Sequence, residues 1–135
     1  MRFLLDTNIC IYLLKAHPLQ LLERFKITSL GDVVMSVVTY AELRHGIERT
    51  PEQDRAAAVH ALQRFIARVP VLPFDESAAQ SYGLLAAAVR ERRRDTLDRL
   101  IAAHAVSVGV TLVTNNEADF KDYPGLVVEN WARSP

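Results

Sequence analysis

Five short apolar runs divide the chain, and longer stretches with a helical repeat lie between them. The runs cover residues 2–6, 32–37, 69–74, 110–114 and 126–129. They are nearly continuous rather than alternating, which is typical of strands buried on both faces of a parallel sheet. We therefore predict five parallel strands.

The intervening stretches carry apolar residues at three- and four-residue steps, as in Val59, Leu62 and Phe65, and again in Leu97, Ile101 and Ala105. Helices are predicted at 7–15 and 18–29, from near Pro51, after a cap at Asp75, and up to a stop at Gly109. A pair of helices separated near Asp95 is expected between the third and fourth strands. Strands that alternate with helices predict an α/β fold, a three-layer sandwich with helices flanking the central sheet.

Composition places few limits on function. The 135 residues are half hydrophobic and fit one domain spanning 1–135, and the 16 basic residues balance the 16 acidic ones. The lone Cys10 excludes an intramolecular disulfide. No leader pattern and no uninterrupted apolar stretch of about 18 residues is visible, so we expect a cytoplasmic protein without a membrane partner.

Polar residues follow the predicted strands. Asp6, Thr7 and Asn8 follow the first strand, Ser36 to Thr39 and then Glu42 follow the second, and Thr114 to Asn116 with Asp119 follow the fourth. Asp98 opens the helix before that fourth strand. Ligands of open parallel sheets bind beyond the carboxyl ends of the strands, so these side chains are candidates for one shared site.

Clustered carboxylates repel one another unless a cation neutralises them, which favours a metal site. Carboxylate, amide and hydroxyl oxygens suit Mg²⁺ or Mn²⁺. The four histidines and Cys10 show no zinc-ligand spacing, and His104 fits a hydrogen-bonded core position. Helix capping by Asp6, Asp98 and Asn116, and a capping box of Thr39 with Glu42, remain open alternatives.

Four motifs carry a family resemblance. They are residues 3–12 (FLLDTNICIY), 36–46 (SVVTYAELRHG), 97–105 (LDRLIAAHA) and 112–116 (LVTNN) with Asp119 and Phe120, followed by the ending 124–131 (PGLVVENW). In these motifs and their order the sequence resembles the PIN-domain ribonucleases, and within them the VapC-type toxins of bacterial toxin–antitoxin pairs. The resemblance covers nearly the whole chain.

The resemblance implies an endoribonuclease that hydrolyses RNA phosphodiester bonds with Mg²⁺-activated water, leaving a 5′-phosphate and a 3′-hydroxyl. It implies Asp6, Glu42 and Asp98 as the catalytic, metal-holding triad, with Mn²⁺ as a substitute ion. The family's fourth acidic position is Asn116 here, with Asp119 three residues later, and either can complete the metal site. Thr7, Asn8 and Thr114 are expected to orient water or phosphate, or else to make local turn and cap bonds.

Partners are also implied. Arg92, Arg93, Arg94 and Arg99 form a basic patch that could steer RNA phosphates or simply solvate a helix end. Family relatives are held inactive by a cognate antitoxin whose tail covers the site, in a hetero-oligomer. They commonly form homodimers through their early helices, which would make interface residues of the leucines there, namely Leu13, Leu14, Leu21 and Leu22.

Two other classes of protein remain as rivals. A phosphoacceptor receiver domain also uses a parallel sheet, Mg²⁺ and a strand-end aspartate, but no lysine follows the fourth strand before Lys121. A catalytically silent PIN-like module that only binds RNA or protein is the second rival, and the intact triad argues against it.

Overall fold

Five parallel strands form the central sheet of the computed structural model, which describes residues 1–89 and 96–132. The strands are β1 (Phe3–Leu5), β2 (Val33–Ser36), β3 (Val71–Leu72), β4 (Thr111–Val113) and β5 (Val128–Glu129), in the spatial order β3-β2-β1-β4-β5. Every predicted strand is confirmed, and each is shorter than its apolar run. The strand order rules out the receiver fold, whose order is 2-1-3-4-5.

The helices lie between the strands as expected. The first four are α1 (Thr7–Leu14), α2 (Leu19–Lys26), α3 (Val37–Glu48) and α4 (Glu52–Arg68), and the next two are α5 (Glu76–Ala88) and α6 (Thr96–Val108). A short 3₁₀ turn, η1 (Glu117–Asp119), follows β4. Asp75 caps α5 by accepting a hydrogen bond from the Ala78 N–H, and Gly109 ends α6 with φ +72°, as predicted.

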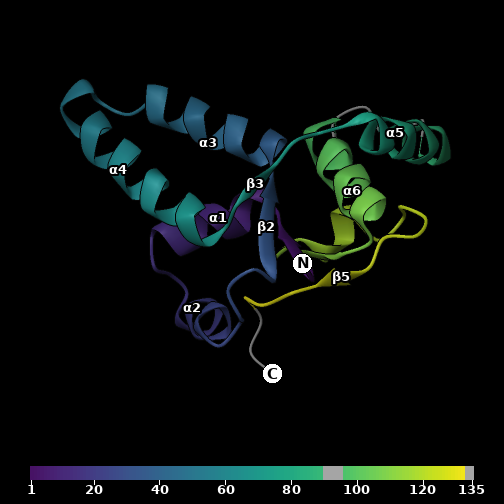
Figure 1. Cartoon of the computed structure of the whole chain (residues 1–135), viewed down its shortest axis with the longest axis horizontal. Coiled ribbons are helices and arrows are strands. Elements are labelled where there is room, and N and C mark those ends of the chain that lie inside the picture. The colour runs from purple at the N-terminus through teal and green to yellow at the C-terminus, as the bar shows by residue number, and fades with distance from the viewer. Residues whose placement is uncertain (90–95, 133–135) are drawn as a thin grey trace.

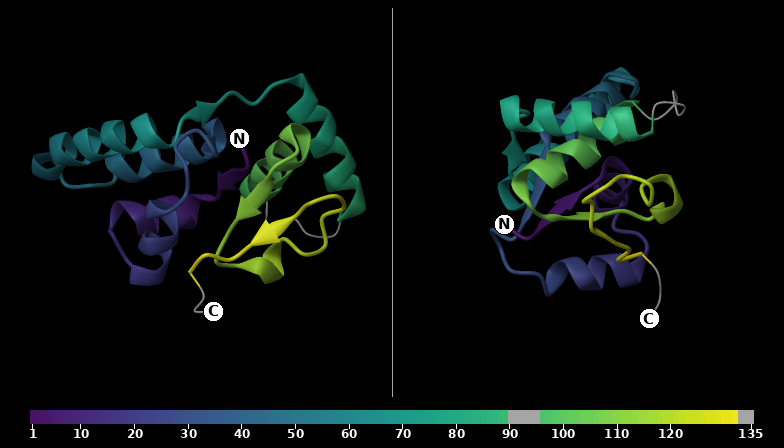
Figure 2. Two further views of the ribbon diagram at one scale, coloured as in Figure 1. Left: turned by 60° about the horizontal axis from the view of Figure 1, so that its bottom comes forward. Right: turned by 90° about the vertical axis from the view of Figure 1, so that its right-hand side faces the viewer.

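Two hydrophobic cores lie on opposite faces of the sheet. Phe3 and Leu5 point into the core shared with α1 to α4, whereas Leu4 between them points into the core shared with α5 and α6. Figure 1 shows α3 and α4 side by side and projecting from the sheet, with α5 and α6 on the opposite side. The views in Figure 2 show the same three-layer arrangement.

Two of the proposed interface leucines belong to the core. Leu13 and Leu21 are buried against the sheet, whereas Leu14 is exposed and Leu22 is partly buried. The expectation that all four form an interface is therefore wrong for Leu13 and Leu21, because α1 and α2 need these side chains to pack on the sheet. Among the described residues, no helix is long and apolar enough to cross a bilayer.

Candidate active site

The carboxyl edge of the sheet collects buried polar side chains. Asp6 directly follows β1, Ser36 ends β2 and Thr114 directly follows β4, and all three are buried. The chain runs outward from β1 through β2 to β3 and then returns to the other side of β1 to form β4, so the topological switch point lies between β1 and β4 at this edge. Switch points are where open α/β sheets bind ligands.

Asp6 is the most unusual of these groups, since it is a carboxylate only 4% exposed. Burial raises the pKa of Asp6 to about 6; hydrogen bonds from Thr114 and from the Ile9 N–H lower it, and the carboxylates of Asp98 and Glu42 raise it. Asp6 is also the N-cap of α1, with Ile9 N 2.9 Å from Oδ1. The capping bond uses Oδ1 and is compatible with a further role for Asp6 at this edge.

Thr114 connects Asp6 with the turn beyond β4. Its hydroxyl accepts the Asn116 N–H at 3.1 Å, and it makes the side-chain hydrogen bond to Asp6. An ionised carboxylate only accepts hydrogen bonds, so the Thr114 hydroxyl group donates its proton to Asp6. This bond favours the charged form of the aspartate.

Glu42 is tied to α1 by a chain of hydroxyl groups. Thr7 Oγ1 donates to Glu42 Oε1 at 2.6 Å, and Thr39 Oγ1 lies 3.2 Å from Thr7 Oγ1. Because Thr7 has a single proton and gives it to Glu42, Thr39 is the donor in the second bond. The order Thr39 to Thr7 to Glu42 joins α1 to α3 beside Asp6.

The capping-box alternative for Thr39 and Glu42 is wrong. Helix α3 begins at Val37, and its N-cap is Ser36, whose hydroxyl accepts the Val38 N–H at 3.1 Å. Thr39 and Glu42 lie inside the helix, where neither can close a capping box. Asn116 likewise gives η1 no side-chain cap, because its amide donates to the Asp119 carboxylate instead.

The predicted site residues thus divide into two groups. Glu42 and Asp98 both lie within electrostatic range of Asp6, while Thr7 is bonded to Glu42 and Thr114 to Asp6. Asp98, the third residue of α6, is half-buried. Asn8 is exposed on α1, and Asn116 and Asp119 bond to each other across η1.

The basic patch needs a correction at Arg99. Its side chain is only 7% exposed and does not offer a free guanidinium to RNA. Burial lowers the pKa of Arg99, but hydrogen bonds to Tyr82 and Tyr123 outweigh it and raise the pKa above its ordinary value. Arg99 therefore anchors α6 in the core. Arg92, Arg93 and Arg94 lie outside the described residues.

The donor chemistry fits a hard divalent cation. Carboxylates and hydroxyls dominate the edge, and the buried Asp6 charge is one that a cation would stabilise. Within residues 1–89 and 96–132, however, no three His, Cys, Asp or Glu side chains are drawn together as a ready-made ligand set.

Some hydrogen bonds at this edge could not be predicted from the sequence. Asn115 Nδ2 donates to Tyr12 Oη at 3.1 Å, which links the end of β4 to α1. His104 Nδ1 lies 2.7 Å from Ser36 Oγ, which confirms the hydrogen-bonded core histidine but adds a partner at the end of β2. The bonded residues are 103 positions apart in the Tyr12–Asn115 pair and 68 positions apart in the Ser36–His104 pair, so local sequence patterns do not reveal these contacts.

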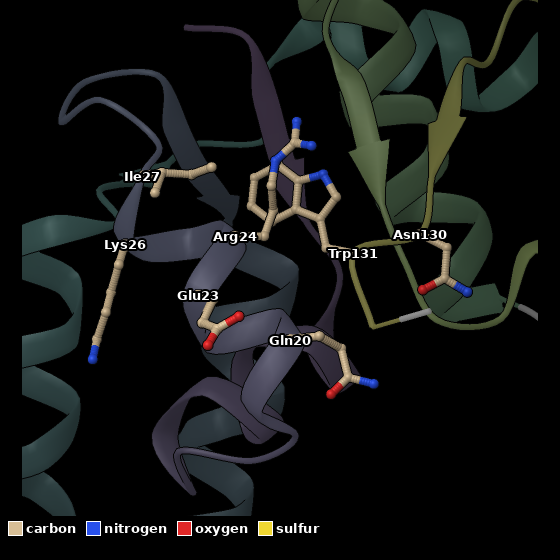
Figure 3. Close-up of a pocket in the computed structure, with 7 residues that line it drawn as sticks. All are labelled: Gln20, Glu23, Arg24, Lys26, Ile27, Asn130 and Trp131. Carbon is tan, nitrogen blue, oxygen red and sulfur yellow. The ribbon is translucent and has the colours of Figure 1, made fainter. Parts of the chain in front are cut away.

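Grooves border helices α1 to α4 in the part of the chain that the structure describes. The larger, about 750 Å³, runs between α2 and Trp131 (Figure 3), where Arg24 stacks on the indole ring at 4.9 Å. The smaller, about 430 Å³, lies among α1, α3 and α4, and its lining includes Glu42, Leu14 and Ile47. The lining of the larger groove does not include Asp6, Glu42 or Asp98, whereas the lining of the smaller one includes Glu42.

Comparison with known proteins agrees with this geometry. The family model of the PIN domain matches residues 3–126, a span that includes every candidate residue from Asp6 to Asp119. The chain is 37% identical over 134 residues to the tRNA(fMet)-specific endonuclease VapC of Shigella flexneri, covering 98% of this chain and 99% of that protein. It is 31% identical over 134 residues to ribonuclease VapC2 of Rickettsia felis, covering 97% and 98%.

Solved structures give the same result. A chain in the crystal structure of VapBC2 from Rickettsia felis bound to a promoter DNA fragment superposes with a TM-score of 0.87 at 30% identity, over 97% of this chain and 99% of that one. A chain of VapBC-1 from nontypeable Haemophilus influenzae gives 0.87 at 33% identity, over 98% and 100%. The likeness therefore extends over both halves of the sheet and all the helices.

Proposed function

Because this chain belongs to the PIN-domain family and its relatives are VapC ribonucleases, we propose that it is the endoribonuclease toxin of a toxin–antitoxin pair, dependent on Mg²⁺ or Mn²⁺. The observation that carries the proposal is Asp6, a buried carboxylate at the switch point whose pKa is raised to about 6 and which lies near Glu42 and Asp98.

In this proposal Asp6 and Asp98 hold the cation, with Asn116 or Asp119 as further candidates. When bound, the ion supplies positive charge against the scissile phosphate and makes a water molecule more acidic. Glu42 accepts the proton of the attacking water. Thr7 keeps that carboxylate oriented through Oε1, so Oε2 remains an acceptor. The Thr114 hydroxyl holds Asp6 in its charged form.

The proposed substrate is RNA, and initiator tRNA is the first to test because a relative 37% identical is named as specific for it. Arg92 to Arg94 remain the proposed phosphate-contacting patch, and Asn8, exposed on α1, a proposed contact for water or phosphate.

The proposed partner is a cognate antitoxin, since similar structures are VapBC complexes. The groove among α1, α3 and α4 suits its tail, because the lining is largely apolar and includes Glu42. A segment lying there would restrict access to the site. The proposal also includes a homodimer, which light scattering of the purified chain at several concentrations would detect.

The test is cleavage of initiator tRNA, elongator tRNA and total RNA by the purified chain, with EDTA and then added Mg²⁺ or Mn²⁺. We expect cleavage that EDTA stops, that either ion restores, and that leaves 5′-phosphate ends. Cleavage unaffected by EDTA, or restored by Zn²⁺ alone, would contradict the metal assignment. Folded protein that cuts none of these RNAs under any condition would support the silent binding module.

A further inference from the structure

The site depends on keeping α3 and α6 in a fixed relation, because Glu42 lies on α3 and Asp98 on α6. Glu42 lies six residues after Ser36, and Asp98 lies six residues before His104. At a rise of about 1.5 Å per residue, Glu42 thus lies about 9 Å along α3 from Ser36, and Asp98 lies about 9 Å along α6 from His104. These two residues bond directly to each other, at 2.7 Å.

We propose that the Ser36–His104 hydrogen bond is a positioning element of the active site, which sets the first turn of α3 against α6 and thereby places Glu42 relative to Asp6 and Asp98. This inference rests on the proposed function. Ser36 and His104 touch neither substrate nor cation in it, and they act through the helix that carries Glu42.

Ser36 is suited to this role because its hydroxyl makes two bonds at once. It caps α3 by accepting the Val38 N–H at 3.1 Å, and it meets His104 Nδ1 on its other side. The His104 ring also hydrogen-bonds to the Pro73 carbonyl, which can only accept, so the ring carries its proton there. In the neutral ring Nδ1 is then the acceptor, and Ser36 donates to it.

The surroundings make this bond rigid. Ser36 is 0% and His104 is 1% exposed, and Phe74 packs edge-on against the imidazole with ring centroids 5.4 Å apart. Burial lowers the pKa of His104, while Asp75 and the Pro73 carbonyl raise it. With water excluded, loss of either partner leaves the other buried and unsatisfied. The turn from Ser36 into α3 would then shift.

Two near-isosteric variants separate the contacts of His104. His104→Asn keeps a polar atom at the position of Nδ1, toward Ser36, and loses the contact with Pro73. His104→Gln keeps a polar atom near Nε2, toward Pro73, and loses the contact with Ser36. Ser107→Ala is the control on the same helix, since its hydroxyl bonds only one turn back, to the His104 carbonyl at 2.8 Å.

We expect His104→Gln to lower kcat ~10- to 10²-fold with KM nearly unchanged, because a displacement of about 1 Å in a catalytic group can cost that much. His104→Asn should retain most of the wild-type kcat, and Ser107→Ala all of it. Ser36→Gly should resemble His104→Gln, because it also removes the bond between Ser36 and His104, and Gly is still tolerated as an N-cap residue.

A double-mutant cycle with Glu42→Gln completes the test. If the pair acts by placing Glu42, then Ser36→Gly and His104→Gln lower kcat in the wild-type background and have little further effect once Glu42 is replaced. Equal kcat for wild type and both folded variants would overturn the inference, as would the same fold-loss in both backgrounds. Should His104→Gln not fold, Ser36→Gly decides alone. Failure of the proposed function looks different, because wild-type protein would then lack metal-dependent cleavage.

Discussion

Aspartates at the two edges of the sheet experience opposite environments. Asp6 at the carboxyl edge is 4% exposed, and among the described residues its interactions are hydrogen bonds and like charges rather than an ion pair. The side chain of Asp32, at the amino edge just before β2, is 28% exposed and lies 3.9 Å from the N-terminal amine and from Arg2.

The difference indicates that the buried carboxylate at the carboxyl edge lowers the stability of the fold, whereas the one at the amino edge does not. Burying a charge without a counter-charge is unfavourable, which is consistent with the proposal that Asp6 serves a cation site. Asp32 meets no such conflict, since water and two cationic groups surround it. The comparison can be tested by making the same chemical change at both edges.

The largest effect is expected from Asp98→Asn and Asp6→Asn, which remove charge from the proposed metal site but keep the side-chain shape. Loss of cation-mediated stabilisation is worth several kcal/mol, so the cleavage rate should fall ~10³-fold or more. Asp6→Asn is preferable to Asp6→Ala, because Asn keeps the cap on α1. A wild-type cleavage rate in either folded variant would show that this aspartate matters no more for activity than Asp32 at the amino edge.

Glu42→Gln should lower the rate by at least ~10²-fold, because Gln retains an acceptor for Thr7 but cannot take a proton from water. The matched control is Glu48→Gln, at the exposed end of the same helix. If Glu42→Gln cuts RNA as fast as Glu48→Gln does, Glu42 is not the general base.

The third effect concerns stability and pH. The pKa of Asp6 is raised from 3.8 to about 6 on folding, so its contribution to stability is greatest at low pH and is lost as the pH rises through about 6. At pH 7 the buried charge costs the metal-free protein up to ~3 kcal/mol. Asp6→Asn should therefore raise the thermal midpoint in EDTA, and by more at pH 7 than at pH 4.

The stabilisation of the wild-type protein by Mg²⁺ should increase as the pH rises, which is the converse of the pH dependence of the metal-free protein. Because protons compete for Asp6, the Mg²⁺-induced rise in thermal midpoint should be larger at pH 7.5 than at pH 5, and it should be absent from Asp6→Asn. The measurement is a thermal melt at two pH values, with Asp32→Asn as the control. An Mg²⁺ response that does not depend on pH would mean that Asp6 is not a ligand.

The smallest effect is expected from Asp32→Asn itself. Its ion pairs are partly exposed, and such pairs contribute ~1 kcal/mol or less. The thermal midpoint should change by at most a few degrees and the cleavage rate should not change. A rate loss comparable to that of Asp6→Asn would show that the amino edge is also part of the active site.

Local patterns predicted much of this structure because the relevant signals are local. Buried parallel strands read as apolar runs, and Asp75 and Gly109 mark helix ends through short-range bonding and backbone conformation. Parallel strands also bring their carboxyl ends to one edge, so Asp6 and Thr114 could be placed together without knowing the strand order.

The errors arose where a distant partner decides the outcome. Arg99 lies beyond the basic run that ends at Arg94 and is grouped with it in the sequence-based prediction, yet its side chain is buried, with hydrogen bonds to Tyr82 and Tyr123. The Thr39–Glu42 spacing satisfied a capping rule, but the cap belongs to Ser36 because α3 begins without a loop after β2. The Ser36–His104 contact depends on the packing of α6, which single-sequence patterns do not contain.

The strand order also determines when activity can first arise during synthesis. Central strand β1 pairs with β2 on one side, but its other neighbour is β4, where Phe3 aligns with Thr111. Chains grow from the N-terminus, so β1 must wait with one edge unpaired for more than 100 residues to be added. Until then Asp6 has neither Thr114 nor Asp98 beside it. If the proposed site is correct, a growing chain in which β4 has not yet formed is expected to have no nuclease activity.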